Sequence, residues 1–225
     1  MPRGRRSGRV VTMLQPERTV LAGADLEYLP GFLGPVEADE LLAVLLAEVP
    51  WQRPVVQLFG RTFPSPRLAA WYGDTDAVYQ YSGLVNEPLP WLPSLVMLRT
   101  RIENRLGRPF NGVLLNLYRD GADSMGWHRD NEPELGKNPE IASISLGGVR
   151  RFLLHHCRRS DLPGLEIRPD HGSLLLMRGA TQHFWRHAVP KTRKAVAPRV
   201  NLTFRRVIPA EKIPDTAQDF VVASC

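Results

Sequence analysis

The 225 residues are 43% hydrophobic, enough for the core of one soluble domain, and the longest strictly apolar run, Leu41 to Ala47, is too short to cross a bilayer. Two distant cysteines, Cys157 and Cys225, exclude a disulfide framework and a zinc ribbon, so we expect a cytoplasmic protein without membrane contact, nucleoid-associated if bacterial. The formal net charge is +6, and only four of the 29 basic residues are lysine; this excess of arginine favours a polyanionic partner such as nucleic acid.

The first predicted elements are a flexible arm and two helices. Residues 1–20 are expected to form a basic arm, residues 21–210 the folded domain, and residues 211–225 a C-terminal tail. A helix is predicted from Pro35, because proline suits a helix start and is followed here by acidic and then apolar residues at helical spacing. A second helix is predicted from Pro93 to a stop signal at Gly107.

Short β-like runs dominate from residue 112 onward, separated by glycine, proline and aspartate. Regular short strands without helices between them indicate an antiparallel sandwich or barrel. The predicted fold is therefore mainly β with flanking helices.

Polar side chains share one face of two of these predicted strands. Solvent exposure is the ordinary explanation of such a face, but two arginines with an amide between them would also hold a dicarboxylate inside a barrel. By strand alternation, the side chains that share a face are Arg199, Asn201, Thr203 and Arg205 on one strand, and Asn116 and Tyr118 on another.

The stretch "GWHRDNE" places His128 two residues before Asp130. An alternating strand would bring both to one side, and a distant second histidine would complete the 2-His-1-carboxylate group that binds iron(II) and leaves its other coordination positions open. A His-x-Asp alone is weak evidence, since it often occurs by chance. The spacing does not select the second histidine, and the candidates are His155, His156, His171, His183 and His187.

Six stretches occur in the order and spacing of a known family: "LLNLYRDG", "WHRDNEPELG", "IASISLGGVRRF", "HGSLLLM", "FWRHAVPK" and "APRVNLTFRRV". Over residues 25 to 207 the chain resembles the AlkB family of iron(II)- and 2-oxoglutarate-dependent dioxygenases, and most closely its duplex-acting DNA repair branch. The resemblance implies a double-stranded β-helix, or jelly roll, that uses Fe(II), 2-oxoglutarate and dioxygen. It implies that His187 joins His128 and Asp130 as the third iron ligand. It also implies a 2-oxoglutarate pocket in which Arg199 binds the distal carboxylate, completed by Asn116, Tyr118, Asn201 and Arg205.

The activity that this resemblance implies is oxidative demethylation of N-alkylated bases in DNA, such as 1-methyladenine and 3-methylcytosine. The by-products would be formaldehyde, succinate and carbon dioxide. The expected partner of the monomeric enzyme is duplex DNA with a flipped methylated base, while single-stranded DNA and RNA stay open. Two alternatives also stay open: a dioxygenase of the same fold that acts on RNA or protein, and a non-catalytic basic module that binds nucleic acid.

A methylated base inside a duplex must be flipped out before it can reach a buried iron. Residues 51–90 resemble the family's nucleotide-recognition lid, and a hairpin is predicted there with its turn near Phe59 and Gly60. Phe59 is the expected intercalating residue, flanked by Gly60 and Arg61, although a phenylalanine at a loop tip is more often a partly buried anchor. The residues expected around the flipped base are Tyr79, Gln80, Tyr81 and Ser82, with strand packing as the alternative for the tyrosines.

Further candidates for substrate contact lie near the predicted metal group. Asn131 and Glu132 directly follow the aspartate and are expected near the exocyclic amine of the base, although Glu132 is equally a candidate surface charge. Arg67 is expected to line the base pocket. The loop between the third ligand and the pocket arginine carries the cations expected to bind backbone phosphates, namely Lys191, Arg193 and Lys194.

Overall fold

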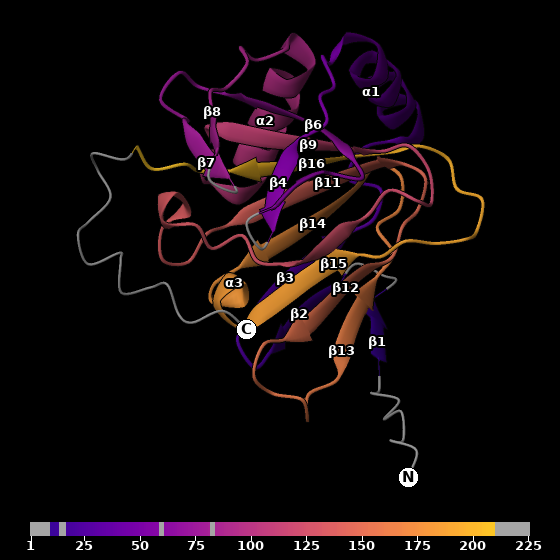
Figure 1. Cartoon of the computed structure of the whole chain (residues 1–225), viewed down its shortest axis with the longest axis vertical. Coiled ribbons are helices and arrows are strands. Elements are labelled where there is room, and N and C mark those ends of the chain that lie inside the picture. Colours follow the sequence, from indigo (N-terminus) through magenta and orange to yellow (C-terminus); the bar gives the residue numbers. More distant parts are fainter. Residues whose placement is uncertain (1–9, 14–16, 59–60, 82–83, 210–225) are drawn as a thin grey trace.

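The computed structural model describes residues 10–13, 17–58, 61–81 and 84–209, which form two facing sheets with helices on one side (Figure 1). The larger sheet has the strand order β2 (Glu17–Leu21), β3 (Ala24–Leu29), β14 (Ser173–Arg178), β11 (Ile141–Gly147), β16 (Arg199–Arg205), β9 (Gly112–Tyr118) and β6 (Leu68–Gly73). The smaller sheet has the order β1 (Val10–Met13), β13 (Gly164–Ile167), β12 (Phe152–His156), β15 (Trp185–Val189) and β10 (Met125–His128). Strands pair antiparallel throughout both sheets, apart from the parallel pair β1 and β13.

Two hairpins and four helical segments complete the described chain. The hairpins are β4 (Val55–Leu58) with β5 (Arg61–Pro64), and β7 (Tyr79–Tyr81) with β8 (Leu84–Asn86). The helical segments are α1 (Pro35–Glu48), α2 (Pro93–Leu106), α3 (Thr181–Phe184) and the 3-10 turn η1 (Pro133–Leu135).

Both long helices begin at the predicted prolines, and α2 ends at the predicted glycine. Proline occupies the first turn of α1 and of α2, where the missing N–H costs no helical hydrogen bond. Gly107 ends α2 with φ +64°, a left-handed conformation that glycine adopts without a steric penalty.

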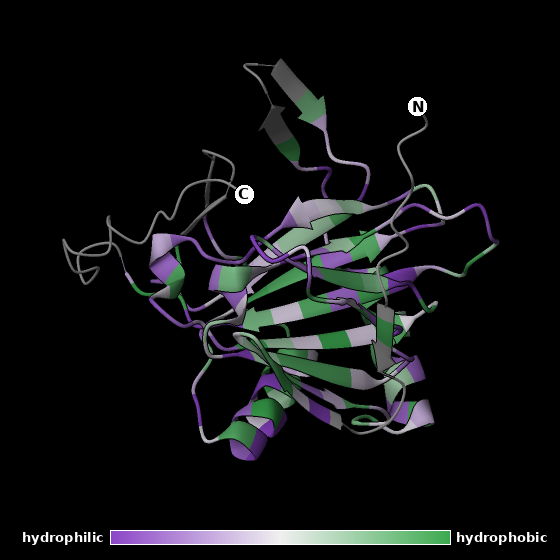
Figure 2. Cartoon of the chain, turned by 90° about the horizontal axis from the view of Figure 1, so that it is seen from below, coloured by the Kyte–Doolittle hydropathy of each residue, from purple (hydrophilic) through white to green (hydrophobic). Residues whose placement is uncertain are grey.

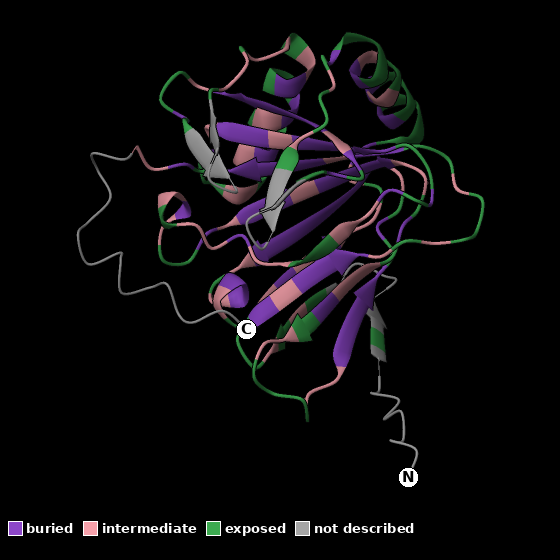
Figure 3. Ribbon diagram, viewed as in Figure 1, coloured by how far each residue is buried: buried purple, intermediate pink, exposed green. Residues whose placement is uncertain are grey.

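The central strands of the larger sheet are buried on both faces, which Figure 3 shows as mostly purple strands in the middle of the molecule. On one face, Val200, Leu202 and Phe204 of β16 pack in a core with residues of α1 and α2. On the other face, a second core lies between the two sheets and includes Leu175 and Trp185. Figure 2 shows hydrophobic residues running along the strands of the sheets. Because its apolar face meets the helices, the polar face of β16 points toward the smaller sheet, as strand alternation predicts.

Two strands lie within the range that the sequence analysis assigned to a flexible arm. Residues 10–13 form β1 and pair with β13, and residues 17–21 form β2 and pair with β3. Backbone pairing therefore extends the folded body to residue 10, and no local sequence signal revealed this because the partners lie elsewhere in the chain.

Candidate metal and co-substrate site

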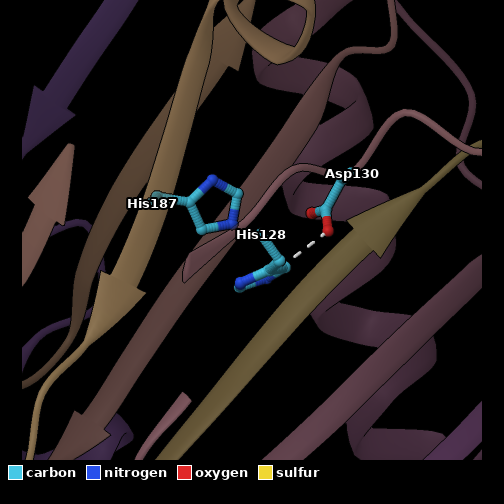
Figure 4. A group of neighbouring side chains, drawn as sticks. All are labelled: His128, Asp130 and His187. Atoms are coloured by element: carbon cyan, nitrogen blue, oxygen red, sulfur yellow. Dashed lines mark ion pairs between the residues drawn. The ribbon is translucent and has the colours of Figure 1, made fainter. Parts of the chain in front are cut away.

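Three predicted metal ligands meet between the two sheets. His128 ends β10 and lies opposite His187 on β15, and Asp130 follows two residues after His128. The two imidazole rings have centroids 4.2 Å apart, and one ligand atom from each of the three residues lies within 4.8 Å of the others (Figure 4). Two imidazoles and one carboxylate form a donor set that fits iron(II) and leaves coordination positions open.

The strand that carries this pair differs from the prediction. We expected one alternating strand to hold both His128 and Asp130, but β10 ends at His128. Between the pairs Met125–Val189 and His128–His187, β10 has two residues and β15 has one, so Gly126 and Trp127 form a β-bulge. A bulge breaks alternation and re-aims the following side chain, so His128 points into the site from an irregular strand end.

Hydrogen bonds orient two of the three ligands, His128 and Asp130, around the metal position. The Nδ1 of His128 lies 2.9 Å from the carbonyl oxygen of Gly126, and because a carbonyl only accepts, Nδ1 carries the proton and Nε2 keeps its lone pair. Oδ2 of Asp130 lies 3.0 Å from Nη2 of Arg205, and the backbone N–H of Asp130 donates to Oε1 of Gln182 at 3.1 Å. Neighbouring groups thus hold these two ligands in place, whereas the Nδ1 of His187 is buried and has no hydrogen-bond partner among the described residues.

The protonation states suit metal binding. Burial, reinforced by the neighbouring His128, lowers the pKa of His187 to about 3, and burial also lowers the pKa of His128. Burial acts to raise the pKa of Asp130, but Arg205 and the two imidazoles outweigh it and lower that pKa. Two neutral imidazoles and one anionic carboxylate result at neutral pH, the forms in which these side chains coordinate a metal.

A buried arginine lies at the other end of the same polar face. Arg199 is 2% exposed, its Nη2 donates to Ser145 Oγ at 2.8 Å, and its guanidinium carbon lies 5.3 Å from the ring centroid of Tyr118. Its Nε and Nη1 are buried and have no hydrogen-bond partner among the residues that the structure describes. A buried cation with unsatisfied donors is costly by itself, so this site fits the carboxylate of a small co-substrate.

The remaining pocket residues are brought together by strand register. Arg199 lies opposite Tyr118 and Asn201 lies opposite Asn116, because β16 and β9 are neighbours. Asn201 donates through Nδ2 to Ser143 Oγ at 2.8 Å and to the carbonyl of Ile144 at 2.9 Å. The five predicted pocket residues thus share one face, which runs from the metal group at one end to Arg199 at the other.

Three supporting residues were missed by the sequence analysis. Ser143 and Ser145 lie on β11 and hold Asn201 and Arg199, and alternation in "IASISLG" could have indicated them. Gln182 holds the metal-binding aspartate from α3, and no sequence signal identifies it.

Arg67 connects the co-substrate face to a cavity. It is 3% exposed, and it donates from Nε to Asn116 Oδ1 at 2.6 Å and from Nη1 to Ser65 Oγ at 2.9 Å. Its charge also acts on His128 and lowers the pKa of that imidazole. A cavity of about 190 Å³ opens beside Arg67, and its walls include Ala69, Trp71, Leu89 and Leu114. Asn131 and Glu132 are half-buried just beyond the metal-binding aspartate.

The predicted lid is described in part. Phe59, Gly60 and Ser82 lie outside the described residues. Leu58 pairs with Arg61, which agrees with the predicted hairpin, and β7 contains Tyr79, Gln80 and Tyr81, for which the structure describes the backbone. The roles proposed for these residues stay predictions.

The loop after β15 exposes three cations while its backbone is tied down. Lys191, Arg193 and Lys194 are exposed. Hydrogen bonds hold both ends of this loop. The guanidinium of Arg150 donates to the carbonyl oxygen of Pro190 at 2.8 Å, and the backbone N–H of Gly148 donates to the carbonyl oxygen of Pro198 at 2.9 Å. The loop therefore presents three exposed positive charges while hydrogen bonds hold its two ends in place.

The other histidines lie outside the metal group. His171 accepts a hydrogen bond from the N–H of Gly147 at 2.7 Å, so it supports a backbone turn away from the metal group. His155 and His156 belong to β12 and His183 to α3, so only His187 meets the predicted pair.

Residues 25–205 match the 2OG-Fe(II) oxygenase superfamily. The chain belongs to this superfamily. Within it the chain is a member of the AlkB family, as its similarity to curated relatives shows. Alpha-ketoglutarate-dependent dioxygenase alkB homolog 3 of Mus musculus is 45% identical over 188 residues, which cover 80% of this chain and 65% of that protein. DNA oxidative demethylase ALKBH2 of Homo sapiens is 40% identical over 201 residues, which cover 84% of this chain and 76% of that protein.

The AlkB-type chain therefore spans slightly less than two thirds of the length of the alkB homolog 3 proteins. In fold it is similar to the solved structure of OsALKBH1, with a TM-score of 0.58 and 16% identity over 84% of this chain and 100% of that one. The predicted jelly roll is confirmed. The superfamily uses Fe(II), 2-oxoglutarate and dioxygen, and the ligand group and Arg199 pocket of this AlkB family member fit them. No helix within the described ranges has the length and apolar character needed to cross a membrane.

Proposed function

We propose that this chain is an Fe(II)- and 2-oxoglutarate-dependent dioxygenase that removes methyl groups from N-alkylated bases in DNA. The observation that carries the proposal is the pairing of the His128, Asp130 and His187 group with buried, unsatisfied donors of Arg199 on one polar face. The AlkB relatives, among them a DNA oxidative demethylase that is 40% identical, support DNA as the substrate. Burying these charged groups destabilises the fold, and a protein that only binds nucleic acid would not need such a site.

The residues of the chain would divide the work as follows. Arg199 would bind the distal carboxylate of 2-oxoglutarate, with Tyr118 and Asn201 beside it. Arg205 holds the metal-binding aspartate in place and keeps it anionic. Bound Fe(II) would supply the redox chemistry, with dioxygen as the oxidant. One oxygen atom would enter succinate as 2-oxoglutarate loses carbon dioxide, and the other would hydroxylate the methyl group, which then leaves as formaldehyde.

The cavity beside Arg67 is the proposed base pocket. Its walls are mainly apolar, which suits a flipped base, and its lining also includes the charged residues Arg67 and Glu87. Tyr79, Gln80, Tyr81 and Ser82 of the lid, together with Asn131 and Glu132, would complete the pocket. Phe59, flanked by Gly60 and Arg61, would fill the gap left in a duplex. Lys191, Arg193 and Lys194 would bind backbone phosphates.

Turnover of a defined lesion tests the proposal directly. The protein would be incubated with Fe(II), ascorbate, 2-oxoglutarate and matched single- or double-stranded oligonucleotides that carry one 1-methyladenine. We expect loss of the methyl mass that requires 2-oxoglutarate, and the ratio of the two substrates would show the strand preference.

Asp130→Ala separates chemistry from binding in the same assay. We expect turnover to vanish, because a ligand is lost, while DNA affinity stays within about twofold of wild type. Loss of DNA binding together with turnover would instead mean that Asp130 supports the fold. No turnover by the wild type, with 2-oxoglutarate bound, would direct the search to RNA or protein substrates.

A further inference from the structure

An exposed tryptophan lies on the outer face of the smaller sheet, directly behind the metal site. Trp127 precedes His128 on β10, and 44% of its surface meets solvent. Its ring packs edge to face with His155 at a centroid distance of 4.9 Å, and the guanidinium carbon of Arg186 lies 5.5 Å from its ring centroid. These three residues come from three neighbouring strands, so they form one surface, called here the outer platform.

The orientation of the platform follows from strand alternation. His187 and Leu154 are buried on the inner side of β15 and β12 and lie opposite each other. Their neighbours Arg186 and His155 therefore point outward, and these two residues also lie opposite each other. The bulge turns Trp127 to this same outer side while His128 points inward.

The composition of the platform suits an unpaired base. Exposed aromatic rings among cations are typical of surfaces that bind single strands, because every base offers a π-face and the backbone is anionic. Arg186 places its positive charge beside the Trp127 ring, and its Nε is buried and has no hydrogen-bond partner within the described part of the chain. Glu166, on the outer side of β13, is already shared by Arg151 and Arg168, so this face keeps a positive balance.

The surroundings connect the platform to both parts of the proposed site. β10 is the edge strand of the smaller sheet, so a chain that passes around this edge meets His128 on one side and Trp127 on the other. β15 carries Arg186 near its start and runs into the cationic loop at Pro190, roughly 13 Å further along. Backbone phosphates on that loop and a base on the platform can therefore belong to one strand.

We propose that the outer platform of Trp127, Arg186 and His155 stacks an unpaired base that neighbours the lesion on the same DNA strand. This inference rests on the proposed function, since it extends the substrate beyond the flipped base. Bases inside a duplex are already stacked on each other, so the platform would favour single-stranded or locally opened substrates.

Binding of unmodified strands tests the platform without any turnover. The 225-residue protein would be titrated with fluorescently labelled oligothymidylates of four and twelve nucleotides. We expect Trp127→Ala to weaken binding of the twelve-nucleotide strand about tenfold, the loss of one stacked base, and to change binding of the short strand less than twofold. Trp127→Phe keeps an aromatic face and should retain most of the affinity.

Two further variants serve as a control and as an independent test of the platform. Phe184→Ala removes another exposed aromatic side chain, which lies on α3 and stacks on His156, and it should leave binding of both strands unchanged. Arg186→Ala leaves the tryptophan in place, so it tests the platform even if Trp127→Ala lowers the melting temperature. We expect it to weaken only the longer strand, by a few-fold.

Binding of the long strand at wild-type strength by both Trp127→Ala and Arg186→Ala would overturn the platform. Demethylation by the wild-type protein of a trinucleotide that carries 1-methyladenine, measured separately, establishes the proposed function. If the wild-type protein demethylates the trinucleotide and neither variant changes DNA binding, the platform proposal is wrong and the proposed function stands. If the wild-type protein is inactive but both variants bind the long strand more weakly, the proposed function is wrong and the platform stands.

Discussion

Arg199 carries a positive charge into a part of the protein where 2% of its surface meets solvent. Ser145 satisfies one of its nitrogens, and the ring of Tyr118 lies beside it, but neither supplies a countercharge. Burial also lowers the pKa of this guanidinium, which is the direction expected for a cation without a matching anion. The buried charge of Arg199 destabilises the fold when it has no counterion, and a bound carboxylate would offset that destabilisation.

Replacing Arg199 with Gln should therefore weaken co-substrate binding. We expect the KM for 2-oxoglutarate to rise about 10- to 100-fold, because hydrogen bonds to a charged group are lost. Steady-state succinate release at varied 2-oxoglutarate measures this change. Arg151→Gln, on the outer side of the smaller sheet, is the matched control. A KM within twofold of wild type in Arg199→Gln would contradict this assignment.

Glu166 makes a pH-dependent contribution to stability. Hydrogen bonds from Arg151, which outweigh the opposing effect of burial, and from Arg168 lower the pKa of Glu166. A carboxyl with a depressed pKa in the folded state stabilises the protein above its unfolded pKa of about 4.5, and this contribution is lost as the pH falls through the folded pKa. The two arginines are half-exposed, so the contribution is modest, about 1 kcal/mol.

Glu166→Gln should thus lower the free energy of unfolding at pH 7 and have a smaller effect near pH 3. Urea denaturation of both proteins at the two pH values measures this difference. Equal destabilisation at both pH values would indicate lost packing, since packing does not titrate.

At the scale of single elements, local signals predicted the helices and the main strands well. Pro35 and Pro93 mark helix starts, Gly107 marks a helix end, and alternation identified the two faces of β16. These features depend on residues close in the chain, so the sequence alone contains them.

Features that depend on distant partners could not be predicted in this way. The bulge at Gly126 and Trp127 exists only relative to β15, about sixty residues later in the chain. β1 and β2 are strands because β13 and β3 pair with them. Spacing left five histidines open as the third ligand, and the family resemblance selected His187, which the fold places opposite His128.

The loop after β15 depends on a close backbone approach. The N–H of Thr192 donates to the carbonyl of Gly121 at 2.9 Å, and a Cβ added to Gly121 would lie 2.3 Å from the carbonyl oxygen of Thr192. Gly121→Ala should therefore displace the loop and destabilise the protein by about 1–3 kcal/mol.

Thermal melting and duplex affinity together report this displacement, and both should fall. Gly34→Ala is the matched control, because a Cβ there would contact nothing within 4 Å. Unchanged DNA affinity in Gly121→Ala would mean that the loop position does not matter for binding.

Over the whole molecule, the two faces of the larger sheet have different roles. The helices α1 and α2 cover one face (Figure 1). The metal group and the co-substrate face lie on the other face, toward the smaller sheet. The excess of arginine predicted a polyanionic partner, but composition did not show where it would bind, because exposed and buried arginines look alike in a sequence.

Salt dependence measures how many phosphates the exposed loop contacts. Replacing Lys191, Arg193 and Lys194 together with alanine should reduce the slope of log affinity against log salt by about one unit per lost contact. Arg101→Ala, on α2 and paired with Glu37, should leave the slope unchanged. An unchanged slope in the triple variant would place the phosphate contacts elsewhere.

The bulge in β10 also limits how a strand of another molecule could add to this edge of the smaller sheet. An edge strand offers free backbone groups to which a strand of another molecule can add, and such growth would cover the metal group that lies at this edge. The extra residue at Gly126 and Trp127 interrupts the regular spacing of those groups, and the chain leaves the strand right after His128. An incoming strand would therefore find too short a template to extend the sheet, and the edge stays open for substrate.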